Sequence, residues 1–245
     1  MALAMEVLQG LAGMAGSQAL SARIDRVCAS IGIDHWLYAV NLPLLNDRYQ
    51  QFTLGSYPET WVKRYIERDY LKIDPVVAHC HDHSTPLLWS EVRARAERAI
   101  DPLQISVRRM FDEASDAGLA VGLSVPLHGP GQCWGLMSFA SRERAGDALS
   151  GRVAELHLLA HFVHEAARPF ARSRGAAAPP ELTRRERECL HWAAEGKTSW
   201  EVGQLLGVSE RTAVFHLQNA ARKLEVSGRQ AAVARAVSMG LINPA

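Results

Sequence analysis

Four helix-start signals follow one another in the last quarter of this 245-residue chain, and no other feature restricts its fold as strongly. Two of them have the T-x-x-E spacing of a capping box, in which each side chain binds a free N–H of the first helical turn. Helices are predicted to begin after Thr183, Thr198, Ser209 and Ser227. Glycines that readily adopt a left-handed conformation are expected to end three of them, at Gly196, Gly207 and Gly240. Because each cap contributes about 1 kcal/mol, the sequence predicts four short helices.

The third predicted helix has two distinct faces. Its apolar residues recur at helical spacing and are expected to face the other helices; they are Ala213, Leu217, Ala220 and Leu224. The opposite face carries Arg211, Val214, Phe215, Gln218 and Arg222, with His216 and Lys223 at its flanks. A short helix, a tight turn and a second helix with an exposed polar face is typical of the helix-turn-helix, whose second helix enters the major groove of DNA.

The exposed face predicts how DNA would be contacted. Val214 and Gln218 would meet base edges, because glutamine pairs with adenine and a valine methyl contacts a thymine methyl. Phosphate contacts are expected from Arg211, Thr212, Arg222 and Lys223, and the predicted DNA-binding set is completed by Ser209, Phe215 and His216. The spacing alone also fits a helical protein-interaction domain with an ordinary solvated face.

Charge and composition restrict the partners. The chain carries a net charge of +1, and residues 181–245 contain 9 Lys and Arg against 7 Asp and Glu. Phosphate neutralisation supplies most of the non-specific affinity for DNA, so one nearly neutral domain would bind weakly. We therefore expect a homodimer, which doubles the contacts, on a pseudo-palindromic double-stranded DNA site. The four cysteines are scattered, and we see neither a signal peptide nor an apolar run near the roughly 20 residues that span a bilayer. These features favour a soluble cytoplasmic protein without a membrane partner.

The region upstream predicts a second, larger domain. Apolar periodicity favours helices over residues 20–31, after Pro58 and over residues 153–163. Short apolar runs favour strands at residues 36–40, 119–127 and 133–140. Helices around an antiparallel sheet give an α+β fold, with an N-terminal α/β/α sandwich before the four-helix domain. The segment RPFARSRGAAAPP predicts a linker, so we expect domains at residues 1–167 and 181–245 joined by residues 168–180.

Alternation along the last two predicted strands suggests a pocket. One side of the strand at residues 133–140 carries Trp134, Leu136, Ser138 and Ala140. One side of the strand at residues 119–127 carries Ala120, Gly122, Ser124 and Pro126. An interior lined by these residues would be mostly apolar with two hydroxyl groups, which suits an amphiphilic small molecule. Ordinary core packing fits the same pattern, because periodicity does not distinguish a core from a cavity.

Two family resemblances sharpen these expectations. Residues 182–242 resemble the C-terminal domain of LuxR-type transcription regulators, with Glu186, Leu190 and Gly196 at characteristic positions and Val214 where relatives often have a polar residue. The segments YPETWVKRYIERDYLKIDPVVAHCHDHSTPLLW and AGLAVGLSVPLHG resemble the acyl-homoserine-lactone-binding domain of that family, more narrowly its LasR- and QscR-like members. The positions that carry this second resemblance are Tyr57, Trp61, Tyr65, Asp74, Pro75, Trp89 and Gly122.

The resemblance implies a quorum-sensing regulator that binds an N-acyl-homoserine lactone, with no cofactor besides this signal and no metal. Trp61 would donate to the lactone carbonyl, and Asp74 would accept the ligand amide N–H. Tyr57 and Ser138 would donate to the amide carbonyl. The predicted ligand-binding set is completed by Ser124 and by residues that enclose ring and acyl chain, namely Leu37, Ala39, Tyr65, Val77, Trp89, Leu119, Trp134 and Leu136. The bulk of Trp134 and Leu136 implies a shorter or bent acyl-chain cavity.

Each of these residues also has a purely structural interpretation. Asp74 before Pro75 is a typical helix cap, and both tryptophans are ordinary core residues. The histidines of residues 79–83 lack the separated pairs usual in zinc sites. A regulator with another signal or none stays open, whereas an enzyme is disfavoured because no nucleophile elbow or paired Cys and His motif is present.

The expected mechanism is ligand-coupled folding. An empty pocket would leave Asp74 and several donors without partners, at roughly 1–3 kcal/mol each. Signal binding would satisfy these groups, stabilise the domain and permit dimerisation.

Overall fold

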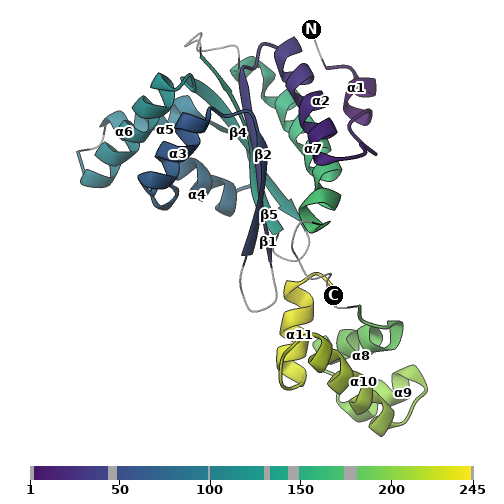
Figure 1. Ribbon diagram of the computed structural model, residues 1–245. Helices are drawn as coiled ribbons and strands as arrows, with labels where there is room; N and C mark the ends of the chain where they lie inside the picture. Colours follow the sequence, from purple (N-terminus) through teal and green to yellow (C-terminus); the bar gives the residue numbers. More distant parts are fainter. Residues whose placement is uncertain are drawn as a thin grey trace. The chain divides into compact units, whose positions relative to one another are not determined.

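The computed structural model describes residues 3–43, 49–98, 100–129, 133–142, 149–173 and 181–243 (Figure 1). The chain divides into two compact units, one containing the sheet with helices α1–α7 and the other containing helices α8–α11. Within the described ranges, no helix has both the length and the apolar character needed to cross a membrane.

The N-terminal unit is built on a five-stranded sheet in the order β2-β1-β5-β4-β3. Its strands are β1 (His35–Pro43), β2 (Tyr49–Gly55), β3 (Leu87–Leu88), β4 (Val121–Gly129) and β5 (Cys133–Ser141). β1 pairs with β5, and β3 with β4, in antiparallel register. The short connection from β4 to β5 makes that pair an antiparallel hairpin as well. The predicted strands are confirmed, with β4 beginning at Val121 rather than Leu119.

One face of the sheet packs against α2 (Ser17–Ser30) and α7 (Val153–Ser173), with the short α1 (Met5–Gln9) beside them (Figure 1). Trp36 donates its indole N–H to Asp25 of α2 at 2.7 Å, and the Tyr38 hydroxyl bonds to Nδ1 of His164 in α7 at 3.0 Å. The predicted apolar stripes of both helices are buried here, apart from the half-buried Val153. These contacts tie the sheet to its first helical layer.

The opposite face is covered by α3 (Glu59–Glu67), α4 (Pro75–Asp82), α5 (Trp89–Arg98) and α6 (Pro102–Asp116), with a 3-10 turn at Tyr70–Lys72. Helices on both faces confirm the predicted α/β/α sandwich. In α3 the side chain of Trp61 is buried, whereas Ile66, which the spacing groups with it, is 71% exposed. The buried face of α3 is therefore narrower than its apolar pattern predicts.

The C-terminal unit contains α8 (Arg184–Ala194), α9 (Ser199–Leu206), α10 (Glu210–Lys223) and α11 (Arg229–Ser238). Both predicted capping boxes form, and Ser209 Oγ accepts the Thr212 N–H at 3.1 Å. The prediction that Ser227 caps the fourth helix is wrong. Gly228 occupies that position with a φ of 90°, a conformation that glycine adopts without strain, and no side chain caps α11.

Helix α7 extends further than the sequence predicts. It follows a 3-10 turn at Ser150–Arg152 and continues through Ser173, so the first part of the expected linker at residues 168–180 is helical. Pro169 lies inside this helix and removes one backbone donor, but Ala171 is still buried in the last turn. Local packing therefore keeps the final turn helical despite the proline, and residues 174–180 lie outside the described residues.

Candidate ligand-binding site and DNA-binding helix

The predicted ligand-binding residues of the central strands share the sheet face that α3–α6 cover. Leu37 lies opposite Ser138, and Ala39 lies opposite Leu136, in the β1–β5 pairing. Directly paired residues of antiparallel strands project from the same face. Leu136 and Ala39 pack into the hydrophobic cluster formed with these helices. The predicted alternation along β5 is therefore confirmed for Leu136 and Ala140, which both belong to this cluster.

Aromatic side chains from α3 form one wall of this cluster. The ring centroid of Trp61 lies 5.8 Å from that of Tyr65 and 6.0 Å from that of Tyr70, and the Trp61 and Tyr70 rings are stacked. Sequence reasoning missed Tyr70. It directly follows Asp69, whose backbone is in the left-handed conformation, so its position does not continue the helical spacing of α3. The same cluster gathers other predicted residues, namely Tyr57, Val77, Trp89 and Leu119.

The Asp74 carboxylate has two partners inside the protein. One oxygen accepts the Val76 N–H at 2.8 Å and caps α4, and the other accepts the Tyr65 hydroxyl at 2.8 Å. Burial raises the pKa of Asp74, and these hydrogen bonds oppose that shift. The Val77 backbone N–H also acts on this carboxylate, and since a carboxylate offers about four lone-pair sites, capacity remains for a further donor. The helix-cap interpretation of Asp74 is thus confirmed, and it leaves capacity for ligand binding.

Tyr57 contributes a polar group without a partner. Its hydroxyl oxygen is buried and has no hydrogen bond of good geometry within the described structure, although the Ser138 hydroxyl lies close enough to act on it. Burial raises the pKa of this phenol, and the neighbouring Ser138 hydroxyl partly opposes the shift. An unsatisfied hydroxyl beside Asp74 and Ser138 costs free energy in the empty protein, which a ligand acceptor would relieve.

Two buried serines connect the sheet to Trp89. The Trp89 indole N–H donates to Ser124 Oγ at 2.9 Å, and Ser124 Oγ lies 2.7 Å from Ser138 Oγ. The Trp89 ring lies so close to Gly122 that a Cβ at that position would fall 2.3 Å from a ring carbon. Glycine is therefore the residue that allows the indole to lie flat against β4.

Trp134 lies near the histidine-rich end of α4. Its ring meets the His81 ring edge-on with centroids 4.7 Å apart, and His81 also contacts Asp82. His79 and His83 stack with centroids 4.5 Å apart. Among the described residues, no group of three or more His, Cys, Asp or Glu side chains is placed to hold a metal ion.

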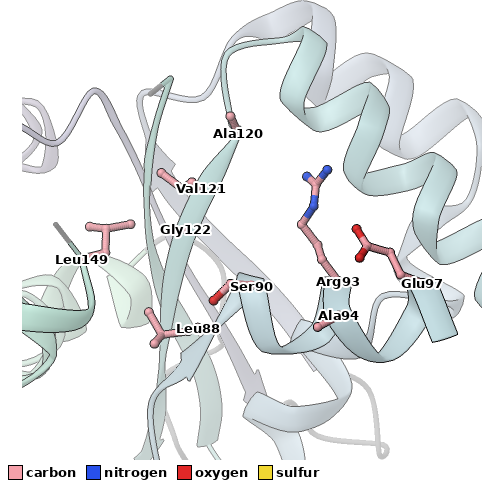
Figure 2. Close-up of a pocket in the computed structure, with 9 residues that line it drawn as sticks. All are labelled: Leu88, Ser90, Arg93, Ala94, Glu97, Ala120, Val121, Gly122 and Leu149. Atoms are coloured by element: carbon pink, nitrogen blue, oxygen red, sulfur yellow. The ribbon is translucent and has the colours of Figure 1, made fainter. Parts of the chain in front are cut away.

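A separate pocket of about 300 Å³ opens at the outer edge of the sheet, where β3 leads into α5 (Figure 2). It is lined by Leu88, Ser90, Arg93, Ala94, Glu97, Ala120, Val121, Gly122 and Leu149. The Arg93 guanidinium donates to the Phe111 carbonyl and to Asp112, both at 3.3 Å. Ala120 and Gly122, which the strand alternation assigns to the predicted interior, line this pocket, whereas none of the residues of the predicted ligand-binding set does.

Helix α10 presents the predicted DNA-reading face. Ala213, Leu217, Ala220 and Leu224 are buried against the other helices, as the spacing predicts. Arg211, Gln218 and Arg222 are exposed, Val214 and His216 are half-buried, and Phe215 is 57% exposed with its ring beside His216. Ser209 Oγ and Thr212 Oγ1 lie 2.8 Å apart at the start of the helix. These side chains form one surface along α10.

Lys223 differs from the other cations of α10. Its ammonium donates to Glu186 at 2.8 Å and to the Glu181 carbonyl at 3.0 Å, which ties the end of α10 to the start of α8. Burial raises the pKa of Glu186, but Lys223 and the Thr183 backbone outweigh this effect, so the net shift is downward. The contact of Lys223 with phosphate stays a prediction, and its observed contacts are internal.

The comparisons with known proteins match both units. Residues 16–167 match the autoinducer binding domain, and residues 180–236 match the bacterial regulatory proteins of the luxR family. The chain belongs to the LuxR family. It is thus a transcription regulator with an autoinducer-binding domain and a DNA-binding helix-turn-helix, and not an enzyme. The predicted family is confirmed, whereas the narrower likeness to LasR and QscR stays a prediction.

Similar LuxR-family proteins are known over nearly the whole length. AhyR of Aeromonas hydrophila, a transcriptional activator protein, is 32% identical over 98% of this chain and 92% of its own length. RpaR of Rhodopseudomonas palustris, a quorum sensing-dependent regulator, is 33% identical over 91% of this chain and 88% of its own length. The structure of Escherichia coli SdiA is 25% identical with a TM-score of 0.72 and covers 97% of both chains. SdiA has also been solved in complex with octanoyl-rac-glycerol, and that chain also has a TM-score of 0.72.

Proposed function

We propose that this LuxR-family regulator takes an N-acyl-homoserine lactone as its autoinducer, between the sheet and helices α3–α6. The observation that carries the proposal is the set of polar groups in an otherwise apolar cluster. Asp74 has spare acceptor capacity, Tyr57 has an unpaired buried hydroxyl, and the indole N–H of Trp61 is a donor only. An acyl-homoserine lactone supplies the complementary groups, which are one amide N–H and two carbonyl oxygens.

The apolar part of the ligand would contact the apolar residues on this face of the sheet and on α4. Leu37, Ala39 and Leu136 share the face of the sheet on which Ser138 lies, and Val77 packs from α4. The bulk of Leu136 and Trp134 favours a short or bent acyl chain. The polar set thus selects the head group, while the strand residues select the chain.

The regulator is proposed to act in the cytoplasm as a homodimer on a pseudo-palindromic promoter site and to activate transcription, as AhyR is named to do. Val214 and Gln218 would read bases from the exposed face of α10, while Arg211 and Arg222 would contact phosphates. The predicted phosphate contact of Lys223 would compete with the bond from its ammonium to Glu186. Two copies would double the phosphate contacts that one nearly neutral domain provides.

Ligand binding is proposed to stabilise the N-terminal unit and thereby the dimer. A free ligand concentration a hundredfold above the dissociation constant stabilises a folded state by about 2.7 kcal/mol. In the unliganded protein the buried Tyr57 hydroxyl lacks a partner, and this stabilisation relieves that deficit.

Copurification tests the ligand assignment. The full chain would be expressed in a host fed a mixture of N-acyl-homoserine lactones, and bound small molecules would be identified by mass spectrometry. We expect a lactone near one equivalent per protomer, and a strong loss for Trp61→Phe, which keeps the ring but removes the donor. Trp200→Phe is the matched control, because Trp200 is exposed in α9. Recovery of an acylglycerol, or of no ligand from folded wild-type protein, would overturn the lactone assignment.

A binding-site selection tests the DNA part separately. Purified liganded protein would be incubated with random duplexes, and the selected sequences are expected to contain two inverted half-sites. Gln218→Ala is expected to relax the preference at one position in each half-site, because base contacts carry the sequence information. Selection of a single half-site by a monomer would contradict the proposed dimer.

A further inference from the structure

Trp89, Ser124 and Ser138 form a continuous chain of hydrogen-bonding groups in the N-terminal unit. The indole nitrogen of Trp89 lies 2.9 Å from Ser124 Oγ, and the two serine oxygens lie 2.7 Å apart. Ser124 is fully buried and Ser138 is 4% exposed. With so little access to bulk water, the order of these bonds is decided by the chemistry of the three side chains.

The chain has a preferred direction. An indole N–H only donates, so Ser124 Oγ accepts from Trp89. If Ser124 then donates to Ser138, the Trp89 N–H and the Ser124 O–H each have an acceptor. The reverse order would point the Ser138 proton at Ser124 and leave the buried Ser124 proton without an acceptor, at a cost of about 1–3 kcal/mol. The first order instead leaves the Ser138 proton pointing away from the chain, so once a third group accepts that proton, only the first order gives every proton of the chain an acceptor.

The starting point of the chain is held rigidly. Gly122 allows the Trp89 ring to lie against β4, and the Phe111 ring packs on it with centroids 6.0 Å apart. Trp89 itself is 6% exposed. Because the indole has little freedom to rotate, its N–H points constantly at Ser124.

The free end of the chain reaches the predicted head-group region. Ser138 lies opposite Leu37 on the face toward α3–α6, and the Tyr57 hydroxyl nearby is buried without a hydrogen-bond partner. A carbonyl oxygen has two lone pairs, so it would accept from the Ser138 and Tyr57 hydroxyls together.

We propose that Trp89 and Ser124 are positioning residues that fix the Ser138 hydroxyl as a hydrogen-bond donor toward the amide carbonyl oxygen of the signal. The inference rests on the proposed function and extends it to two residues that act through Ser138. This role requires the hydroxyl group of Ser124, whereas ordinary packing in a strand would require only a small side chain there.

The test compares two ligands that differ in one acceptor atom. N-Octanoyl-homoserine lactone and its thioamide counterpart share the N–H donor and the planar linkage, but sulfur is the weaker acceptor. The two would compete for full-length protein at equal free concentration, and mass spectrometry of the bound fraction would give their affinity ratio. This readout samples only folded, liganded protein, so a general loss of stability does not alter it.

We expect the wild-type protein to prefer the oxygen ligand by about tenfold, which corresponds to hydrogen bonds worth about 1.4 kcal/mol in total. Ser138→Ala and Ser124→Ala should each reduce this preference to about two- to threefold. The double variant should show no further reduction, because both changes remove the same donor. Trp89→Phe, which lacks the indole donor, should lower the ratio, and Ser124→Thr should retain it.

Val76→Ala is the matched control, since Val76 is buried in the same cluster but is outside the chain. It should lower both affinities equally and leave the ratio unchanged. A wild-type ratio in Ser124→Ala together with a reduced ratio in Ser138→Ala would overturn the positioning role. Failure of wild-type protein to bind either ligand would instead contradict the proposed function, so the two failures are distinguishable.

Discussion

Replacing Gly122 with alanine would place a methyl group inside the van der Waals envelope of Trp89. The added Cβ would lie 2.3–2.4 Å from three carbons of the indole ring. The ring cannot retreat freely, because it is buried, packs against Phe111 and donates a hydrogen bond to Ser124. The substitution therefore forces the indole to move.

The expected destabilisation follows from these contacts. Overpacking of a close-packed interior costs about 1–3 kcal/mol, and the loss of the Trp89–Ser124 bond adds about 1 kcal/mol. The sum is about 2–4 kcal/mol. For a domain of this size each kcal/mol shifts the melting temperature by about 2–4 °C, so the Tm of the N-terminal transition should fall by about 4–16 °C.

Thermal unfolding of the full chain, with wild type and variant in the same ligand state, measures this effect. Gly151→Ala is the matched control, because a Cβ at Gly151 meets no atom within 4 Å. Adding Trp89→Phe to Gly122→Ala should recover part of the loss, since the smaller ring makes room for the methyl group. A Tm for Gly122→Ala equal to that of the Gly151 control would refute the reasoning.

Three further predictions concern stability. Ser209→Ala removes the cap of α10 and should destabilise the C-terminal unit by about 1 kcal/mol, while Ser209→Asp should not, as thermal melts would show. Glu186→Gln should destabilise that unit at neutral pH, and progressively less below about pH 4.5. Because the folded pKa of Glu186 lies below its ordinary value of 4.5, the contribution of this carboxylate to stability is complete above pH 4.5 and is lost as the pH falls further. Thermal melts of wild type and variant across this range test the sign. Tyr38→Phe should cost about 1 kcal/mol in denaturant unfolding, since the buried His164 ring loses its partner, whereas Tyr49→Phe on the exposed part of β2 should cost almost nothing.

Local signals in the sequence predicted most of the C-terminal unit. A capping box involves residues three apart, so Thr183 and Thr198 identify their helices without knowledge of the fold. Ser227 misled the same reasoning, because the start of α11 is set by the backbone conformation of Gly228 rather than by a side chain. Lys223 likewise belongs to the exposed side of α10 by spacing, yet a carboxylate in α8 holds it.

The candidate ligand-binding site was only partly predictable. Family resemblance identified Asp74, and alternation grouped Ser124 with Ser138. Neither source predicted that Tyr70 stacks on Trp61, or that Trp89 donates to Ser124, because both contacts join segments far apart in the chain or out of helical phase. Such partners depend on how helices lie on the sheet, which periodicity does not specify.

The two hydrogen bonds of Asp74 have an evolutionary consequence. One carboxylate both starts α4 and, on the proposed function, recognises the head group, so a change there would damage the scaffold together with recognition. Leu37, Ala39 and Leu136 supply only apolar volume on the same face of the sheet. Receptors that diverge toward new messengers are thus free to vary along the strands while the aspartate stays constant, and laboratory retuning of signal preference should begin at those three positions.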